Sequence, residues 1–201
     1  EELAVYDHDY NSFADGVIIP HSIYDLKLNV GYIQIGGSHD TSEFSCDSFR
    51  HWWYTYGRGH YPNADSILVL CDGGGSNSSR QHLFKRDLQL LADEIGCEIR
   101  IAHYPPYCSK YNPIEHRFFP HVTRACQGVI FSSLELVSEL MGKTSTSKGL
   151  KAFVHIIDKV YETGRKVSAE FKKTIRIVFD NFLPTWNYCA IPIDEANAQV
   201  I

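Results

Sequence analysis

Two carboxylate residues, Asp72 and Glu115, are the strongest candidates for chemistry in this sequence. Asp72 directly follows the apolar run at residues 67–71, and three glycines come next, at residues 73–75. A short, continuous apolar run predicts a strand buried on both faces of a sheet. Open α/β sheets place their chemistry at the carboxyl ends of such strands. The alternative for Asp72 is structural, because Asp often opens a turn or caps a helix, here one beginning near Arg80.

Glu115 belongs to a segment whose spacing predicts the start of a helix. Asn112, Pro113 and Glu115 suit the N-cap, first and third positions of a helix that we expect to run to about Cys126. Glu is a common stabilising choice at the third position, so a purely structural role is the alternative. The case for chemistry rests on where this helix begins relative to Asp72.

The segments between the two carboxylates predict a β-α-β unit. Residues 80–95 carry apolar side chains at helical spacing and end at Gly96, and residues 97–103 have the pattern of a strand. Two strands joined by one helix are expected to be parallel, with a right-handed crossover. The end of the first strand and the start of the later helix then lie at the same edge of the sheet. Asp72 and Glu115 are therefore expected to converge, and their oxygens suit Mg²⁺ (or Mn²⁺).

The rest of the chain predicts further strands and helices, and so an α/β fold. Residues 17–26 and 32–35 are β-rich runs on either side of a turn, which predicts a hairpin. Asp40 and Glu43 have the spacing of a capping box, for a helix expected to stop at Gly57. The remaining expected elements are strands at 3–8, 150–161 and 186–193, and helices beginning at Ser132 or Ser133 and spanning 168–180.

Composition and charge limit the class of protein. The 201 residues are 44% hydrophobic, enough for one sizeable core. No run of about 18 apolar residues is present, and the N-terminus lacks the pattern of a signal peptide, so we expect no membrane span and no export. The six cysteines include no Cys-x-x-Cys pair, which favours a reduced, cytoplasmic protein. A net charge of −5 and a pI near 6.0 do not indicate a nucleic-acid-binding protein.

Three other kinds of site fit the sequence less well. The glycines at 73–75 precede no Gly-Lys-Ser/Thr and fit no G-x-G-x-x-G pattern, so we expect no nucleotide cofactor. No G-x-S-x-G elbow indicates a serine nucleophile. The spacings of the residues available to zinc match no ordinary zinc pattern. Those residues are His103, Cys108, His116, His121 and Cys126.

Several short motifs, in the right order along the chain, carry a resemblance to a known family. They are YDHDY at 6–10, LCDGGGSN at 70–77, HYPP at 103–106, SKYN at 109–112, IEHR at 114–117 and TSTSKGL at 144–150. Together they resemble the Rhodopirellula-type (ISAzo) DDE transposases of bacterial insertion sequences, which are relatives of the mariner-like enzymes. The similarity runs from about Val5 to about Tyr188.

The resemblance implies a ribonuclease-H-like mixed sheet flanked by helices, with a C-terminal β/α elaboration. Residues 1–142 would be the catalytic core and residues 143–201 an extension packed on it. In this family three acids bind two divalent ions, Mg²⁺ or Mn²⁺, for hydrolysis at the transposon end and strand transfer into target DNA. Asp72 matches the second acid and Glu115 the third. The implied partners are DNA and further copies of the chain assembled on it.

The resemblance also leaves one ligand unaccounted for. The resemblance implies a first acid on a strand before the YDHDY segment, and we expect this chain to lack it. Asp7 and Asp9 fall on the following strand by this comparison, which makes them weaker candidates for a metal ligand. The alternative is a catalytically inactive remnant, or a DNA-associated assembly module, that keeps the fold without the chemistry. Lys110 and His116 stand where they could contact phosphates.

Overall fold

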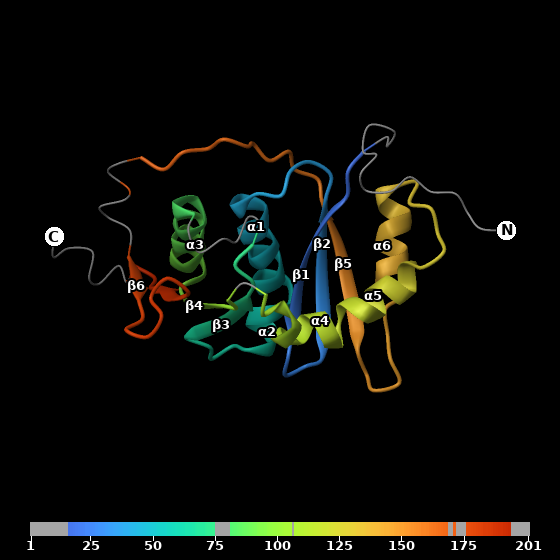
Figure 1. Cartoon of the computed structure of the whole chain (residues 1–201), viewed down its shortest axis with the longest axis horizontal. Coiled ribbons are helices and arrows are strands. Elements are labelled where there is room, and N and C mark those ends of the chain that lie inside the picture. The colour runs from blue at the N-terminus through green and yellow to red at the C-terminus, as the bar shows by residue number, and fades with distance from the viewer. Residues whose placement is uncertain (1–15, 75–80, 106, 169–170, 172–175, 194–201) are drawn as a thin grey trace. The chain divides into compact units, whose positions relative to one another are not determined.

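The computed structural model describes residues 16–74, 81–105, 107–168, 171 and 176–193 (Figure 1). The elements in chain order are β1 (Ile19–Asp25), β2 (Val30–Gly36), α1 (Ser42–Trp52), η2 (Trp53–Gly57), α2 (Arg58–His60), β3 (Ser66–Cys71), α3 (His82–Ile95), β4 (Glu98–His103), η4 (Ser109–Tyr111), α4 (Pro113–Arg117), α5 (Phe119–Cys126), α6 (Leu134–Gly142), β5 (Lys151–Ile157), β6 (Ile177–Phe179) and β7 (Asn187–Ala190). Within these described ranges, no helix is long and apolar enough to cross a membrane.

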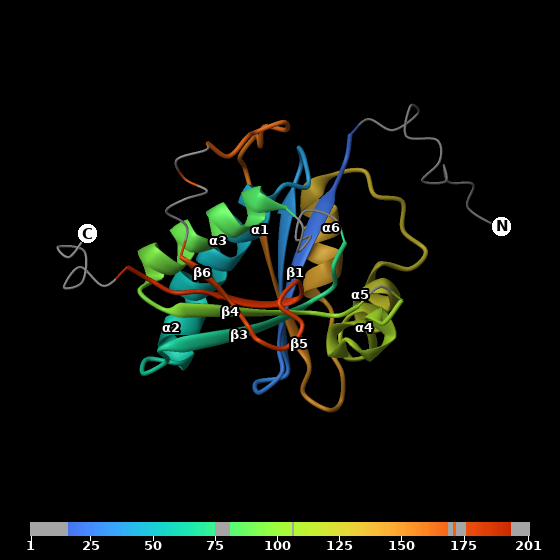
Figure 2. The ribbon, with the colours of Figure 1, turned by 60° about the vertical axis from the view of Figure 1, so that its left-hand side comes forward.

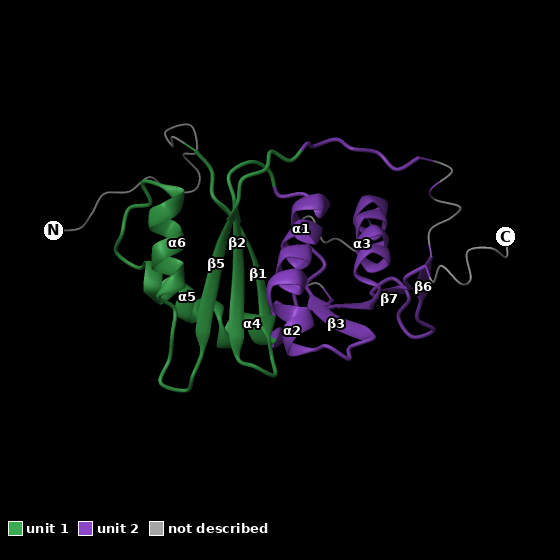
Figure 3. Ribbon diagram, turned by 180° about the vertical axis from the view of Figure 1, so that it is seen from behind, with its two compact units in different colours: residues 1–39, 113–161 green, residues 40–112, 162–201 purple. Residues whose placement is uncertain are grey.

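The chain is α/β, as expected, and it divides into two compact units (Figure 3). Unit 1 takes in residues 1–39 and 113–161, and unit 2 takes in residues 40–112 and 162–201. Each unit has its own mixed sheet, in the order β1-β2-β5 in unit 1 and β3-β4-β7-β6 in unit 2. A ribonuclease-H-like arrangement and a division at residue 142 both stay predictions.

The sheet of unit 1 begins with the hairpin that the sequence predicts. β1 pairs antiparallel with β2, and Asn29 takes the left-handed conformation (φ 55°) that the turn between them requires. β5 then adds parallel to β2 on its other side. Apolar side chains of β2, of α5 and α6, and of the residue between α4 and α5 form the core of this unit. They include Ile33, Ile35, Phe118, Val122, Val137 and Met141.

Gly31 in β2 makes the closest contact of this core. A Cβ atom built on Gly31 would lie 2.0 Å from the ring of Phe118, which is fully buried and stacks on Tyr24 at 5.9 Å between ring centroids. Only glycine leaves room for the ring at this position. Phe118 follows α4 directly, so this contact fixes α4 on the unit 1 sheet.

The single helix expected from Asn112 to about Cys126 is instead two helices, α4 and α5. The helical path breaks at Phe118, whose backbone lies outside the helical region (φ −126°, ψ −61°). Pro120 accounts for the break, because it has no N–H to bond to the carbonyl four residues earlier and its ring clashes there. α6 follows with Ser133 as its N-cap, whose hydroxyl accepts from the Leu136 N–H.

The β3-α3-β4 unit at the centre of unit 2 is confirmed (Figure 2). β3 and β4 are parallel, and α3 ends at Gly96, which adopts the left-handed conformation (φ 65°) predicted for it. The apolar stripe of α3 packs on one face of this sheet, against side chains of β4 and β7. The buried residues of this cluster are Cys46, Phe84, Leu88, Leu91, Ala92, Ile99, Ile101, Tyr188 and Ala190.

β3 differs from the expectation of a strand buried on both faces. Among the described strands it pairs with β4 only, so it lies at the edge of its sheet. Ser66 and Leu68 are exposed, Leu68 by 61%, and the other four residues of the strand are only partly buried. A continuous apolar run predicts a strand, but it does not determine how many of the strand's faces are covered.

Two further helix predictions were partly wrong. Thr41, not Asp40, is the N-cap of α1, since its hydroxyl accepts from the Phe44 N–H. Gly57 does not end the helix, because its backbone is right-handed helical and the chain continues through a π-helical turn, η2, into α2. Trp52 and Trp53, on either side of the junction between α1 and η2, are buried.

The C-terminal part of unit 2 is more extended than the sequence indicated. Residues expected at the end of a helix over 168–180 include the strand β6, which pairs antiparallel with β7. β7 itself lies within the strand predicted at 186–193, and β5 lies within the one predicted at 150–161. The strand predicted at 3–8 lies outside the described residues.

Candidate functional site

Asp72 lies at the carboxyl end of β3 in unit 2, and it is exposed to solvent. The β3-β4 ladder ends beside it, where the Tyr104 N–H donates to the Cys71 carbonyl at 2.8 Å. A Cβ atom at position 74 would meet nothing within 4 Å, and one at position 73 would meet only the Tyr104 carbonyl oxygen, at an ordinary 3.8 Å. The capping alternative for Asp72 is wrong for α3, because Gln81 holds the N-cap position of that helix.

A buried histidine contacts the main chain at Asp72. Nδ1 of His103, the last residue of β4, lies 2.9 Å from the Asp72 carbonyl oxygen and 3.3 Å from Cys71 Sγ. Nε2 of the same ring lies 2.9 Å from the Tyr188 hydroxyl. His103 is 6% exposed and Tyr188 is 2% exposed, so the network is shielded from water.

Burial decides the protonation state of this network. It lowers the pKa of His103 and raises that of Tyr188, and it raises the pKa of the Cys71 thiol to about 12. Burial also lowers the pKa of Lys85, whose ammonium group lies 4.9 Å from the centre of the Tyr188 ring. The ring and the thiol next to Asp72 are therefore neutral at pH 7.

Glu115 lies in unit 1, in the first turn of α4, and is partly exposed. Asn112 precedes the helix in the extended conformation of an N-cap residue, as the sequence predicts. Asp72 and Glu115 thus belong to different units, and their convergence stays a prediction. Lys110 and His116 are exposed on either side of this helix start.

The two predicted site residues offer the donors that a hard divalent cation prefers. Both are carboxylates with solvent access, each at the end of a regular element that fixes its backbone. In the part of the chain that the structure describes, no three His, Cys, Asp or Glu side chains gather at one point. Asp7 and Asp9 lie outside the described residues. All six cysteines, including Cys108 and Cys126, are free thiols.

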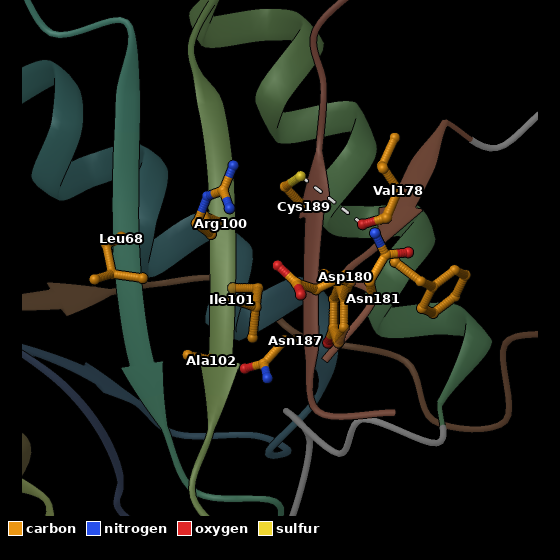
Figure 4. A pocket seen from close by; sticks show the side chains of 11 residues that line it. Leu68, Arg100, Ile101, Ala102, Val178, Asp180, Asn181, Asn187 and Cys189 are labelled. Atoms are coloured by element: carbon orange, nitrogen blue, oxygen red, sulfur yellow. Dashed lines mark hydrogen bonds between the residues drawn. The ribbon is translucent and has the colours of Figure 1, made fainter. Parts of the chain in front are cut away.

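A pocket lies elsewhere on unit 2, on the face of the sheet away from α3 (Figure 4). Leu68, Arg100 and Cys189 line it from three neighbouring strands, β3, β4 and β7. Neither Asp72 nor Glu115 contributes to it.

Sequence reasoning did not identify His103, Tyr188 or Lys85 as residues of the Asp72 surroundings. One signal for His103 was present: it continues the alternation of Ile99 and Ile101, which predicts that its ring points into the core. Tyr188 lies 85 positions further along the chain from His103. Its contact depends on the antiparallel pairing of β4 with β7, which no local pattern indicates.

Comparison with curated proteins and with solved structures gave no match. A family model does match: the Rhodopirellula transposase DDE domain corresponds to residues 1–192 of the 201. The match covers both units and includes Asp72 and Glu115. The chain therefore belongs to the Rhodopirellula transposase DDE domain family.

Proposed function

We propose that this chain is the catalytic domain of a DNA transposase, which hydrolyses phosphodiesters at transposon ends and joins the freed ends to target DNA. The observation that carries the proposal is the coincidence of the family match with the position of Asp72, an exposed carboxylate at the end of a parallel strand. Open α/β sheets place their reacting groups at that position.

Asp72 and Glu115 would hold the divalent cations, Mg²⁺ or Mn²⁺. When bound, such ions supply positive charge that polarises a phosphodiester and lowers the pKa of bound water. Asp72 is suited to this role because the β3-β4 ladder fixes the backbone next to it. Glu115 is suited to it because the first turn of α4 and the buried Phe118 fix its helix.

The order of the elements along the chain supports a ribonuclease-H-like fold in this proposal. A hairpin precedes a helix and a parallel strand-helix-strand unit, and a helix carrying the last acid follows. Lys110 and His116 are exposed near the start of that helix, where a cationic group would attract the phosphates of DNA.

The experiment is a nicking assay on supercoiled plasmid DNA with Mn²⁺, combined with a titration of Mn²⁺ binding. Asp72→Asn and Glu115→Gln are expected to abolish nicking and to weaken Mn²⁺ binding while the proteins stay folded. Two matched controls are available. Asp65→Asn changes an exposed carboxylate at the opposite end of β3, and Glu135→Gln changes the glutamate in the first turn of α6.

Both controls should leave nicking and Mn²⁺ binding at the level of the unmodified chain. The proposal fails if Asp72→Asn binds Mn²⁺ as well as the unmodified chain does. If the unmodified chain binds DNA and Mn²⁺ but cleaves nothing, the alternative of an inactive remnant or assembly module holds instead.

A further inference from the structure

The loop that carries Asp72 leaves β3 at a point where β4 offers no more backbone donors. The last ladder bond runs from the Tyr104 N–H to the Cys71 carbonyl. The next two residues, Pro105 and Pro106, have no N–H. The Asp72 carbonyl is instead bonded by a side chain, the imidazole of His103 at 2.9 Å.

The partners of the His103 ring determine which of its nitrogens carries the proton. A carbonyl oxygen only accepts hydrogen bonds, so Nδ1 donates its proton to the Asp72 carbonyl. Nε2 of the neutral ring is then an acceptor, and the Tyr188 hydroxyl donates to it at 2.9 Å. The opposite tautomer would direct two lone pairs at each other between Nδ1 and the carbonyl oxygen, in a buried site where water cannot compensate.

We propose that His103 is a positioning residue for Asp72, and that Tyr188 keeps the His103 ring in the tautomer this task needs. The hydrogen bond from the His103 ring to the Asp72 carbonyl oxygen fixes the backbone of Asp72. A fixed backbone in turn fixes the direction in which the Asp72 side chain points. The glycines that follow provide no side chain to do this. The inference rests on the proposed function, because it assigns His103 a role toward the metal-binding carboxylate.

Two substitutions test the hydrogen bonds of the two ring nitrogens separately. His103→Asn places an amide N–H near the position of Nδ1, so it can still donate to the Asp72 carbonyl. His103→Gln reaches toward the position of Nε2, so it keeps a partner for Tyr188 but loses the bond to Asp72. Both replace the ring with a smaller amide, which makes each a control for the packing loss of the other.

The first measurement is Mn²⁺ affinity, followed by electron paramagnetic resonance of free Mn²⁺ during titration of the full chain. We expect His103→Gln to bind Mn²⁺ at least about tenfold more weakly than the unmodified chain, the loss typical when the partner of a ligand is removed. His103→Asn should recover most of that affinity, although thermal unfolding should show both variants to be similarly destabilised. A merely structural role would instead give both variants the Mn²⁺ affinity of the unmodified chain.

The second measurement is ¹⁵N NMR of the His103 ring without metal, which reports the tautomer directly. We expect a protonated Nδ1 and an unprotonated Nε2 in the unmodified chain, and a weaker preference for this tautomer in Tyr188→Phe, where only the Asp72 carbonyl still selects it. A protonated Nε2 in the unmodified chain would overturn the inference. Equal Mn²⁺ affinity in the unmodified chain and in His103→Gln would also overturn it. The proposed function itself would be refuted by a different result, an Asp72→Asn variant that binds Mn²⁺ as tightly as the unmodified chain.

Discussion

Gly31→Ala is expected to destabilise unit 1 severely, because the new methyl group would occupy the space of the Phe118 ring. Carbon atoms pack at about 3.5–4.0 Å, whereas the added Cβ would lie 2.0 Å from two ring atoms. The ring would have to move by about 1.5–2 Å. Tyr24 stacks against it, and the core around it is closed, so this movement has no free path.

The loss in the free energy of unfolding depends on whether the Phe118 ring stays in the core or is expelled from it. A strained core that keeps the ring costs about 1–3 kcal/mol. Expelling the ring gives up the burial of about 200 Å², or about 5 kcal/mol at 25 cal/mol per Å². Replacing glycine by alanine returns about 0.5 kcal/mol through the unfolded chain. We therefore expect Gly31→Ala to lower the free energy of unfolding by about 2.5–4.5 kcal/mol, from the upper end of the strained core to full expulsion of the ring.

Urea unfolding followed by circular dichroism measures this loss, and two comparisons test its cause. Gly37→Ala is the matched control, one residue beyond the end of β2, because its Cβ would meet only Leu134 at an ordinary 3.8 Å. Gly31→Ala should also cost almost nothing in a Phe118→Ala background, where the ring is gone. The reasoning is refuted if the losses from Gly31→Ala and Phe118→Ala simply add, or if Gly37→Ala is as harmful as Gly31→Ala.

Three further predictions concern unit 2. Asp87→Ala should lower the free energy of unfolding by about 3 kcal/mol in urea titrations, because the buried carboxylate binds Arg165 at 2.5 Å and the Ser42 hydroxyl at 2.6 Å. The control is the exposed ion pair of Lys143 with Glu139, where Lys143→Ala should leave the free energy of unfolding unchanged. Cys71 should react with iodoacetamide at pH 8 about a thousandfold more slowly than an ordinary thiol, since a pKa raised from 9.0 to about 12 lowers the thiolate fraction by that factor. The reaction rate should rise as the pH approaches 12. Fast labelling of the folded chain at pH 8 would contradict the burial of this thiol. Because the raised pKa favours the neutral thiol in the folded state, the stability that Cys71 contributes is complete below pH 9 and is lost as the pH rises toward 12. Gly96→Ala should lower the free energy of unfolding by about 1 kcal/mol, measured in thermal or urea unfolding. The cause is backbone strain alone, since the φ of 65° disfavours a side chain while nothing crowds the position. An unchanged free energy of unfolding would show that α3 can end differently.

Local patterns predicted the elements whose causes are local. The hairpin of β1 and β2 follows from a turn between two β-rich runs, and the end of α3 follows from Gly96. The break between α4 and α5 also had a local signal, Pro120, but the helical spacing on both sides outweighed it in the expectation of one helix. The cap of α1 was displaced by one residue, because Thr41 and Asp40 are both good N-cap residues.

Pairing between distant segments could not be predicted in the same way. β6 is a strand because β7 offers it an antiparallel partner, and the sequence at 177–179 satisfies helical spacing equally well. The surroundings of Asp72 depend on the same pairing, since Tyr188 reaches His103 only through the register of β4 with β7. The types of residue that could bind metal were readable from the sequence, whereas the groups that orient them were not.

The position of β3 at the edge of its sheet has a consequence for the carboxylate that follows it. Among the described strands, one side of β3 has no partner, so its main-chain N–H and C=O groups on that side form a template for another strand. A strand that pairs in the parallel direction along the whole of this edge comes beside Asp72 at its carboxyl end. An acidic side chain at its tip would then arrive next to Asp72 through main-chain alignment alone, with no dedicated recognition loop.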